Sequence, residues 1–216
     1  MEDWWETREK NKQKEFKEYV LKQSLNEKER RAYYARKQVP IRFRDASIDI
    51  FFDNMKNREI EGDIYEIKKL NERGLPSYRN IIISGDVGVG KTYLLCALYN
   101  EIVREYDVLF LNMMRLIDSV KESFKKPNHE KNSLYNKAIK IPILFIDELG
   151  AGYGTDGERV MMYNLFNSRW ENKKPIIATT NCGQEDLLKR LGKRSYDRVF
   201  PSSEIIRLKI TGESRR

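Results

Sequence analysis

The order of apolar and polar positions divides the chain into two regions. From Trp4 to Lys37 there is neither glycine nor proline, and Phe16, Tyr19 and Val20 recur at helical spacing among many charged residues. This pattern predicts helix. From Tyr78 onward, short β-branched runs alternate with helical patterns. That alternation is typical of an α/β fold, in which a parallel sheet is wrapped by helices.

The first region is expected to form a short helical arm, with residues 1–38 as the arm and residues 39–216 as the main domain. Ser24 to Glu27 has the form of a capping box, in which a serine hydroxyl and a glutamate carboxylate satisfy each other's backbone donors. We therefore expect two helices with a tight joint, ended by Pro40.

So polar an arm can bury little apolar surface, and its large aromatic side chains would be exposed unless a partner covers them. One interpretation is that the arm binds a partner through these aromatics. The other is a solvated helix packed on its own domain. The candidate anchors for a partner are Trp4, Trp5, Phe16 and Tyr19.

The second region is expected to contain a five-stranded parallel sheet between helices. The predicted strands are Asn80–Ser84, Asp107–Asn112, Ile141–Asp147, Pro175–Thr180 and Glu204–Ile210. Apolar residues at three- and four-residue steps predict crossover helices between them. These helices are Lys91–Arg104, Met114–Phe124 and Glu158–Trp170.

Length and composition exclude several classes of protein. A chain of 216 residues fits one ordinary domain plus an extension. Cys96 and Cys182 lie far apart and form no CxxC pair, so neither a disulfide framework nor a zinc site is indicated. No apolar run approaches the roughly 20 residues of a membrane span, and the start of the chain is charged. We expect a cytoplasmic protein with no membrane partner.

Net charge favours a polyanionic partner. Lysine and arginine number 41 against 33 acidic residues, which gives a formal charge of +8. Such an excess favours phosphate contacts, although many basic proteins bind no nucleic acid. Clustering of the basic residues is more informative and indicates a site. Five lie in one short stretch and two end the chain: Lys189, Arg190, Lys193, Arg194, Arg198, Arg215 and Arg216.

A phosphate-binding loop follows the first strand of the predicted sheet and opens a helix. Its sequence matches GxxxxGK[ST] and consists of Gly85, Asp86, Val87, Gly88, Val89, Gly90, Lys91 and Thr92. The glycines let backbone N–H groups turn inward around phosphate oxygens, and the helix N-terminus adds a favourable dipole. Lys91 would reach the β- and γ-phosphates of ATP, and Thr92 would supply a hydroxyl ligand to Mg²⁺.

Two further strands end in polar side chains that suit the same chemistry. The run Ile143–Glu148 is an apolar strand ending in two acids, as in a Walker B motif. Asp147 would hold Mg²⁺, and Glu148 would orient and polarise the attacking water. The next strand ends in Thr179, Thr180 and Asn181, which could place Asn181 beside the γ-phosphate and the water.

This order of motifs resembles the AAA+ ATPases, in which the asparagine is called sensor 1. Four segments resemble more closely the DnaC/IstB group within them, over about Val39 to the C-terminus. These segments are VPIRFRDA from Val39, DELG from Asp147, NSRW from Asn167 and TGESRR from Thr211. The chain stops after the fifth predicted strand, so the helical lid domain of larger AAA+ proteins is expected to be missing, as in that group.

The resemblance implies further roles. Arg198 is similar to the arginine finger that enters a neighbouring subunit's ATP site, with Arg194 as the reserve candidate. Hydrolysis would then need self-assembly. In helicase loaders a helical element after the second strand faces DNA. Here that segment, Leu111–Lys126, offers Arg115, Lys121, Lys125 and Lys126, which could equally form a solvated helix face. The role of Arg215 and Arg216 stays open, and His129 is expected in a surface loop.

Three functions compete for this pattern. The first is a helicase loader, a Mg²⁺-dependent ATPase that binds single-stranded DNA and delivers a hexameric replicative helicase held by its N-terminal arm. The second is an IstB-like transposition helper ATPase that recruits a transposase to target DNA. The third is a nucleotide-gated binding module without hydrolysis, against which the presence of Glu148, Asn181 and Arg198 argues.

Overall fold

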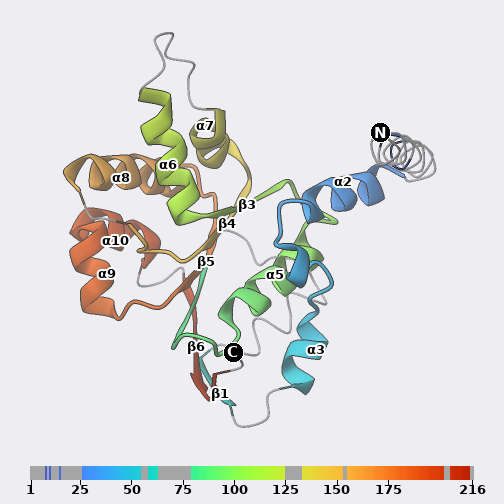
Figure 1. Cartoon of the computed structure of the whole chain (residues 1–216). Helices are drawn as coiled ribbons and strands as arrows, with labels where there is room; N and C mark the ends of the chain where they lie inside the picture. The colour runs from blue at the N-terminus through green and yellow to red at the C-terminus, as the bar shows by residue number, and fades with distance from the viewer. Residues whose placement is uncertain are drawn as a thin grey trace.

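The protein forms three layers, with a sheet between two groups of helices (Figure 1). The computed structural model describes residues 8, 10, 15, 26–54, 58–62, 79–124, 133–152, 155–201 and 205–214. Over these ranges, no helix combines the length and the apolar character needed to cross a bilayer.

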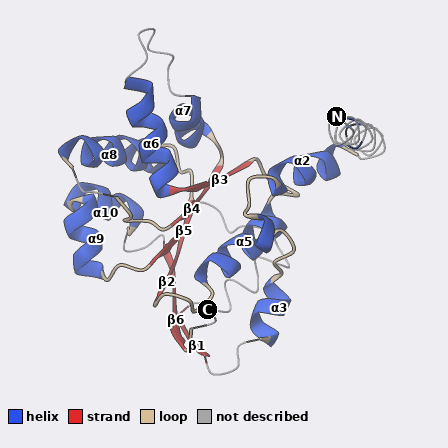
Figure 2. Ribbon diagram, in the orientation of Figure 1, coloured by secondary structure: helices blue, strands red, loops and turns tan. Residues whose placement is uncertain are grey.

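The central sheet has six strands, seen in red in Figure 2, in the order β1-β6-β2-β5-β4-β3. They are β1 (Arg58–Gly62), β2 (Asn80–Gly85), β3 (Val108–Asn112), β4 (Ile143–Asp147), β5 (Ile176–Thr180) and β6 (Ile205–Gly212). Strands β2 to β6 pair in parallel and confirm the five predicted strands to within two residues. The expected count was wrong by one, because β1 pairs antiparallel with β6 at the edge.

The two faces of the sheet bury alternate residues of each strand. Ile81 and Ile83 contribute to a core on one face, while Ile82 contributes to the core on the other. The first face is covered by α5 (Lys91–Ile102), the end of α2 (Glu27–Arg36), η1 (Ile41–Phe43) and α3 (Ile48–Asp53). The second is covered by α6 (Met113–Phe124), α7 (Ser133–Lys140), α8 (Asp156–Glu171), α9 (Gln184–Leu191) and α10 (Lys193–Val199).

Helix α2 starts later than expected. Asn26 and Glu29 exchange backbone-to-side-chain hydrogen bonds of 2.9 and 3.0 Å, which is a reciprocal cap. The expected pair of Ser24 and Glu27 is therefore wrong as the cap of this helix, and Ser24 itself lies outside the described residues. The end of α2 packs on the main domain, since Ala35 is buried and its carbonyl accepts a 2.9 Å hydrogen bond from the Tyr99 hydroxyl.

One fully buried arginine, Arg169 of α8, fixes the amino ends of β4 and β5. Its guanidinium donates four hydrogen bonds of 2.7 to 3.1 Å to backbone carbonyls. The acceptors are Ala138, Ile141, Pro142 and Pro175. Burial lowers the pKa of Arg169 to about 9, so the side chain keeps its charge at neutral pH. One cation thereby binds the backbone carbonyls of the segments that precede β4 and β5.

Candidate functional site

The predicted site residues of the loop after β2 and of the ends of β4 and β5 meet at the carboxyl edge of the sheet. The parallel register places the ends of β2, β4 and β5 side by side, as the topology of such sheets requires. The loop Gly85–Thr92 leaves β2 and enters α5. Asp147 ends β4, Glu148 follows it, and Asn181 follows β5. Sequence patterns that lie far apart in the chain are thus brought to one place.

The loop after β2 depends on glycine because the end of β6 and the segment that follows it lie against the loop. Gly85 has a φ of 142°, and an added Cβ would lie 2.1 Å from the Ile210 carbonyl oxygen. Gly88 has a φ of 90°, and an added Cβ would lie 2.0 Å from the Ser214 hydroxyl oxygen. A side chain at either position would therefore be strained in its backbone and would displace its neighbour.

Lys91 lies at the start of α5 and folds back over the loop. Its ammonium donates a 2.8 Å hydrogen bond to the Gly85 carbonyl and a second, shorter one to the Asp86 carbonyl. Only 7% of Lys91 is exposed. Such a group is a buried cation held by carbonyl dipoles at a helix N-terminus, which suits the capture of an anion.

Asp147 accepts hydrogen bonds from two threonine hydroxyls. Thr92 donates at 3.0 Å and Thr179 at 2.6 Å. Burial raises the pKa of the Asp147 carboxyl, and nearby Glu148 adds to the rise, although both hydroxyls and Lys91 oppose it. A nearby cation would stabilise the ionised form of a carboxylate in this environment. Together with the Thr92 hydroxyl it forms an oxygen donor set that suits Mg²⁺.

Glu148 and the residue after it are held by three hydrogen bonds at the strand end. Its φ is 62°, in the left-handed region. Its N–H donates a 3.0 Å hydrogen bond to the Thr179 hydroxyl, and the following Leu149 N–H donates to the Thr179 carbonyl at 2.7 Å. The Asn112 amide donates to the Glu148 carboxylate at 2.8 Å. The sequence interpretation missed Asn112, although its place at the end of a predicted strand was a usable signal.

A cavity of about 370 Å³ joins these groups, within the range of small-molecule sites. Its polar lining includes Lys91, Thr92, Glu148 and Asn181. It is also lined by an aromatic wall that the sequence interpretation missed. That wall consists of Arg42, Phe43, Phe51 and Tyr93.

The aromatic wall is ordered by ring contacts. Tyr93 stacks on Phe51 and meets Phe43 edge-on, both with ring centres 6.2 Å apart. The Arg42 guanidinium lies 4.9 Å from the centre of the Phe43 ring. A flat π-system could stack on these groups. The cavity therefore combines polar and cationic groups with an aromatic wall.

Arg198 is not brought to this cavity. It lies on α10, and the next residue, Val199, accepts a 2.9 Å hydrogen bond at its carbonyl from the Asn80 side chain. Asn80 is the first residue of β2, whose other end carries the loop. Arg198 thus lies near the amino edge of the sheet, and Arg194 is exposed on the same helix.

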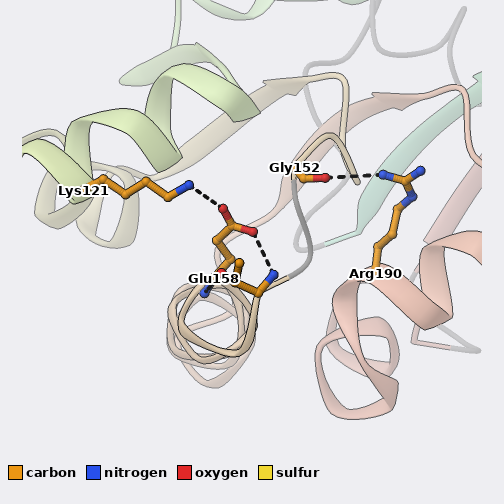
Figure 3. A network of polar contacts seen from close by, with 5 residues as sticks. Lys121, Gly152, Glu158 and Arg190 are labelled. Atoms are coloured by element: carbon orange, nitrogen blue, oxygen red, sulfur yellow. Dashed lines mark hydrogen bonds and ion pairs between the residues drawn. The ribbon is translucent and has the colours of Figure 1, made fainter.

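The candidate DNA contacts on α6 separate into two kinds. Arg115 is exposed, whereas Lys121 forms a 2.7 Å ion pair with buried Glu158 of α8 (Figure 3). Glu158 also closes a capping box with Thr155. Lys121 therefore ties α6 to the start of α8. Lys125, Lys126, His129, Arg215 and Arg216 lie outside the described residues.

Helix α9 holds the loop that follows Glu148. Arg190 donates a 3.5 Å hydrogen bond to the Gly152 carbonyl (Figure 3) and a 3.4 Å hydrogen bond to the Gly150 carbonyl. One arginine of the basic cluster thus has a local structural contact.

Comparison with known proteins places these features in a family. The sequence model of the IstB-like ATP binding protein family matches residues 8–216. Replicative helicase loader DnaC of Escherichia coli (strain K12) is 29% identical over 145 residues, which are 65% of this chain and 59% of that protein. The chain thus spans about three fifths of the length of that curated relative.

Solved structures share the fold. The crystal structure of the DnaC helicase loader matches with a TM-score of 0.64 and 21% identity, over 79% of this chain and 100% of that chain. The replication initiator DnaA bound to AMPPCP and single-stranded DNA matches with a TM-score of 0.56 and 24% identity, over 68% of this chain and 46% of that chain. At these identities the matches establish the architecture alone.

Proposed function

The chain belongs to the IstB-like ATP binding protein family, of the DnaC/IstB type of AAA+ proteins, and from that membership we propose that it is a Mg²⁺-dependent ATPase acting as a replicative helicase loader. One observation carries the ATPase part of the proposal. Lys91, Thr92 and Glu148 line a single cavity, and Asp147 is hydrogen-bonded to Thr92 at its wall.

The polar residues of the cavity and its loop fit a triphosphate and its metal ion. The loop around Gly88 leaves no room for a side chain, so backbone N–H groups can approach phosphate oxygens closely. Lys91 would exchange its loop carbonyls for the β- and γ-phosphate oxygens. Thr92 and Asp147 would hold Mg²⁺, which when bound neutralises charge on the phosphate oxygens.

Glu148 is the proposed base. It lines the cavity, and its carboxylate would orient and polarise the water that attacks the γ-phosphate. The Asn112 amide fixes that carboxylate. Asn181, exposed at the same cavity, would orient the water or the γ-phosphate as the family's sensor 1 does.

The aromatic wall of the cavity would receive the adenine base. Phe43 and Tyr93 present ring faces and edges there, and Arg42 adds a cation. Purine rings stack on such groups. Aromatic residues and phosphate-binding residues line the same cavity, so it would accommodate the whole nucleotide.

Self-assembly would complete the site. Arg198 lies near the amino edge of its own sheet, so it would serve the ATP site of a second copy as an arginine finger. Such a finger stabilises charge on the transferring phosphoryl group and is worth about 10³-fold or more in rate. Assembly on single-stranded DNA would then control hydrolysis.

Single-stranded DNA and a hexameric helicase are the proposed partners. The relatives named DnaC are replicative helicase loaders, and the net charge of +8 suits a polyanion. Exposed Arg115 on α6 is the described candidate for a phosphate contact. The arm, residues 1–38, would hold the helicase.

The test combines ATPase and capture measurements. Steady-state hydrolysis is expected to rise with single-stranded DNA, and Glu148→Gln should remove it. The full chain should capture a hexameric helicase, and a variant lacking residues 1–25 should not. That deletion keeps α2, whose Ala35 packs on the main domain. Capture of a transposase instead would replace the loader proposal with the transposition helper.

A further inference from the structure

Arg198 is held by two residues of the neighbouring helix α8. Its Nε donates a 2.9 Å hydrogen bond to the Asn167 side-chain oxygen. Its guanidinium carbon lies 3.9 Å from the centre of the Trp170 ring. Asn167 and Trp170 are three positions apart in one helix and therefore share a face. One contact fixes an edge of the guanidinium and the other fixes its plane.

The orientation of the Asn167 amide is itself determined. Its nitrogen donates a 2.8 Å hydrogen bond to the Glu171 carboxylate, one turn further along α8. An amide has one acceptor oxygen and one donor nitrogen. With the nitrogen bound to a carboxylate, the oxygen points to Arg198. The direct acceptor is thus neutral, and Arg198 does not form an ion pair with it.

The terminal nitrogens of Arg198 make no hydrogen bond to any described residue. They form the planar pair of donors that matches the oxygens of a carboxylate or phosphate in a bidentate manner. Trp170 remains 43% exposed, so the stacked pair lies at the surface. This arrangement presents a fixed, charged fork to an anion outside the chain.

We infer that Asn167 and Trp170 are positioning residues, which hold Arg198 in the orientation that reaches an ATP phosphate bound to a second copy of the chain. The inference rests on the proposed function, because it needs a finger that acts between copies. A finger that is already in place loses no side-chain freedom when the copies assemble. Misplacement of a catalytic group by about 1 Å can cost about 10²-fold in rate.

The experiment uses mixed full-length variants. Lys91→Ala lacks a usable ATP site but carries a finger, and Arg198→Ala lacks the finger but carries a site. In the mixture, hydrolysis arises only where the first donates its finger to the second. Asn167→Ala is then placed either in the donor or in the acceptor. We expect a fall of about tenfold or more in kcat in the donor placement and less than a twofold change in the acceptor placement.

Conservative variants separate the two contacts. Trp170→Phe in the donor should keep most of the activity, because an aromatic face remains, whereas Trp170→Leu should lose it. Asn167→Asp should also lower kcat, because the new carboxylate holds Arg198 but forms an ion pair with its guanidinium. Val160→Ala is the matched control on α8, where Val160 is 60% exposed. Affinity for ATP should be the same in the wild type and in each Asn167 and Trp170 variant when Lys91 is intact.

Two results would overturn the inference. Equal losses in the donor and acceptor placements would make Asn167 a structural residue of α8. An unchanged kcat in the donor placement would show that the finger needs no positioning. A different result concerns the proposed function: if the Lys91→Ala and Arg198→Ala mixture shows no hydrolysis while Arg198→Ala binds ATP, the shared site fails, and the inference falls with it.

Discussion

Replacing Gly88 by alanine should weaken ATP binding for two separable reasons. The residue has a φ of 90°, which alanine adopts only with strain, and the new Cβ would lie 2.0 Å from the Ser214 hydroxyl oxygen. Asp86 and Val87 of the same loop are exposed, so the loop can relax by changing shape. ATP binding must then restore the original shape.

The expected size follows from these two parts. A non-glycine residue in left-handed backbone costs about 1–2 kcal/mol. Displacing Ser214 adds to this cost, because its Cβ would also lie 2.9 Å from the new methyl group. A total of about 2 kcal/mol corresponds to roughly 30-fold weaker binding. The cost of the left-handed conformation should be the same with or without the Ser214 side chain, whereas the cost of the steric contact depends on that side chain.

Titration calorimetry with ATP and Mg²⁺ on four proteins tests this division. They are the wild type, Gly88→Ala, Ser214→Gly and the double variant. Ser214→Gly removes the hydroxyl and its Cβ. On that background, the loss of ATP affinity caused by Gly88→Ala should be smaller by a factor of about three or more than in the wild type. Gly157→Ala is the matched control, since an added Cβ there meets nothing within 4 Å.

The reasoning fails if Gly88→Ala binds ATP as tightly as the wild type. It also fails in its second part if the cost of Gly88→Ala is the same with and without Ser214. The segment after β6 would then have no influence on the loop.

Three other substitutions test the site and its support. Lys91→Ala should abolish measurable ATP binding, because Lys91 is the one cation of the loop motif; near-normal affinity by titration would refute the site. Glu148→Gln should keep ATP binding and stop turnover; a wild-type steady-state rate would require another base. Arg169→Met should lower the free energy of unfolding by roughly 3 kcal/mol or more, because four carbonyls lose their donor; an unchanged urea midpoint would contradict this.

The sheet could be predicted where its strands are buried on both faces. β2 and β5 read as continuous apolar runs because helices cover both sides of them. β1 gave no such signal, because its sequence REIEG has one apolar residue and Glu59 and Glu61 are exposed at the sheet edge. Its pairing with β6 joins segments about 150 residues apart, which no local pattern encodes.

In the candidate site, too, the residues within local motifs could be predicted, whereas contacts between distant segments could not. Lys91, Thr92 and Asp147 stand in local motifs, and parallel strands bring their ends together as a matter of topology. Asn112 bonds Glu148 across 36 positions of sequence, and nothing in either segment specifies the other. Lys121 could not be distinguished from a DNA contact, since its partner Glu158 lies 37 positions away.

The backbone of Glu148 has a consequence for evolution and engineering. Its φ of 62° is one of two positive values among the described non-glycine residues, and such a conformation costs of order 1–3 kcal/mol. Glycine or asparagine would occupy that position more comfortably but would provide no base. Selection for thermal tolerance alone should therefore favour glycine or asparagine at position 148, which gives an inactive protein. Selection for turnover keeps glutamate there although its backbone conformation is unfavourable.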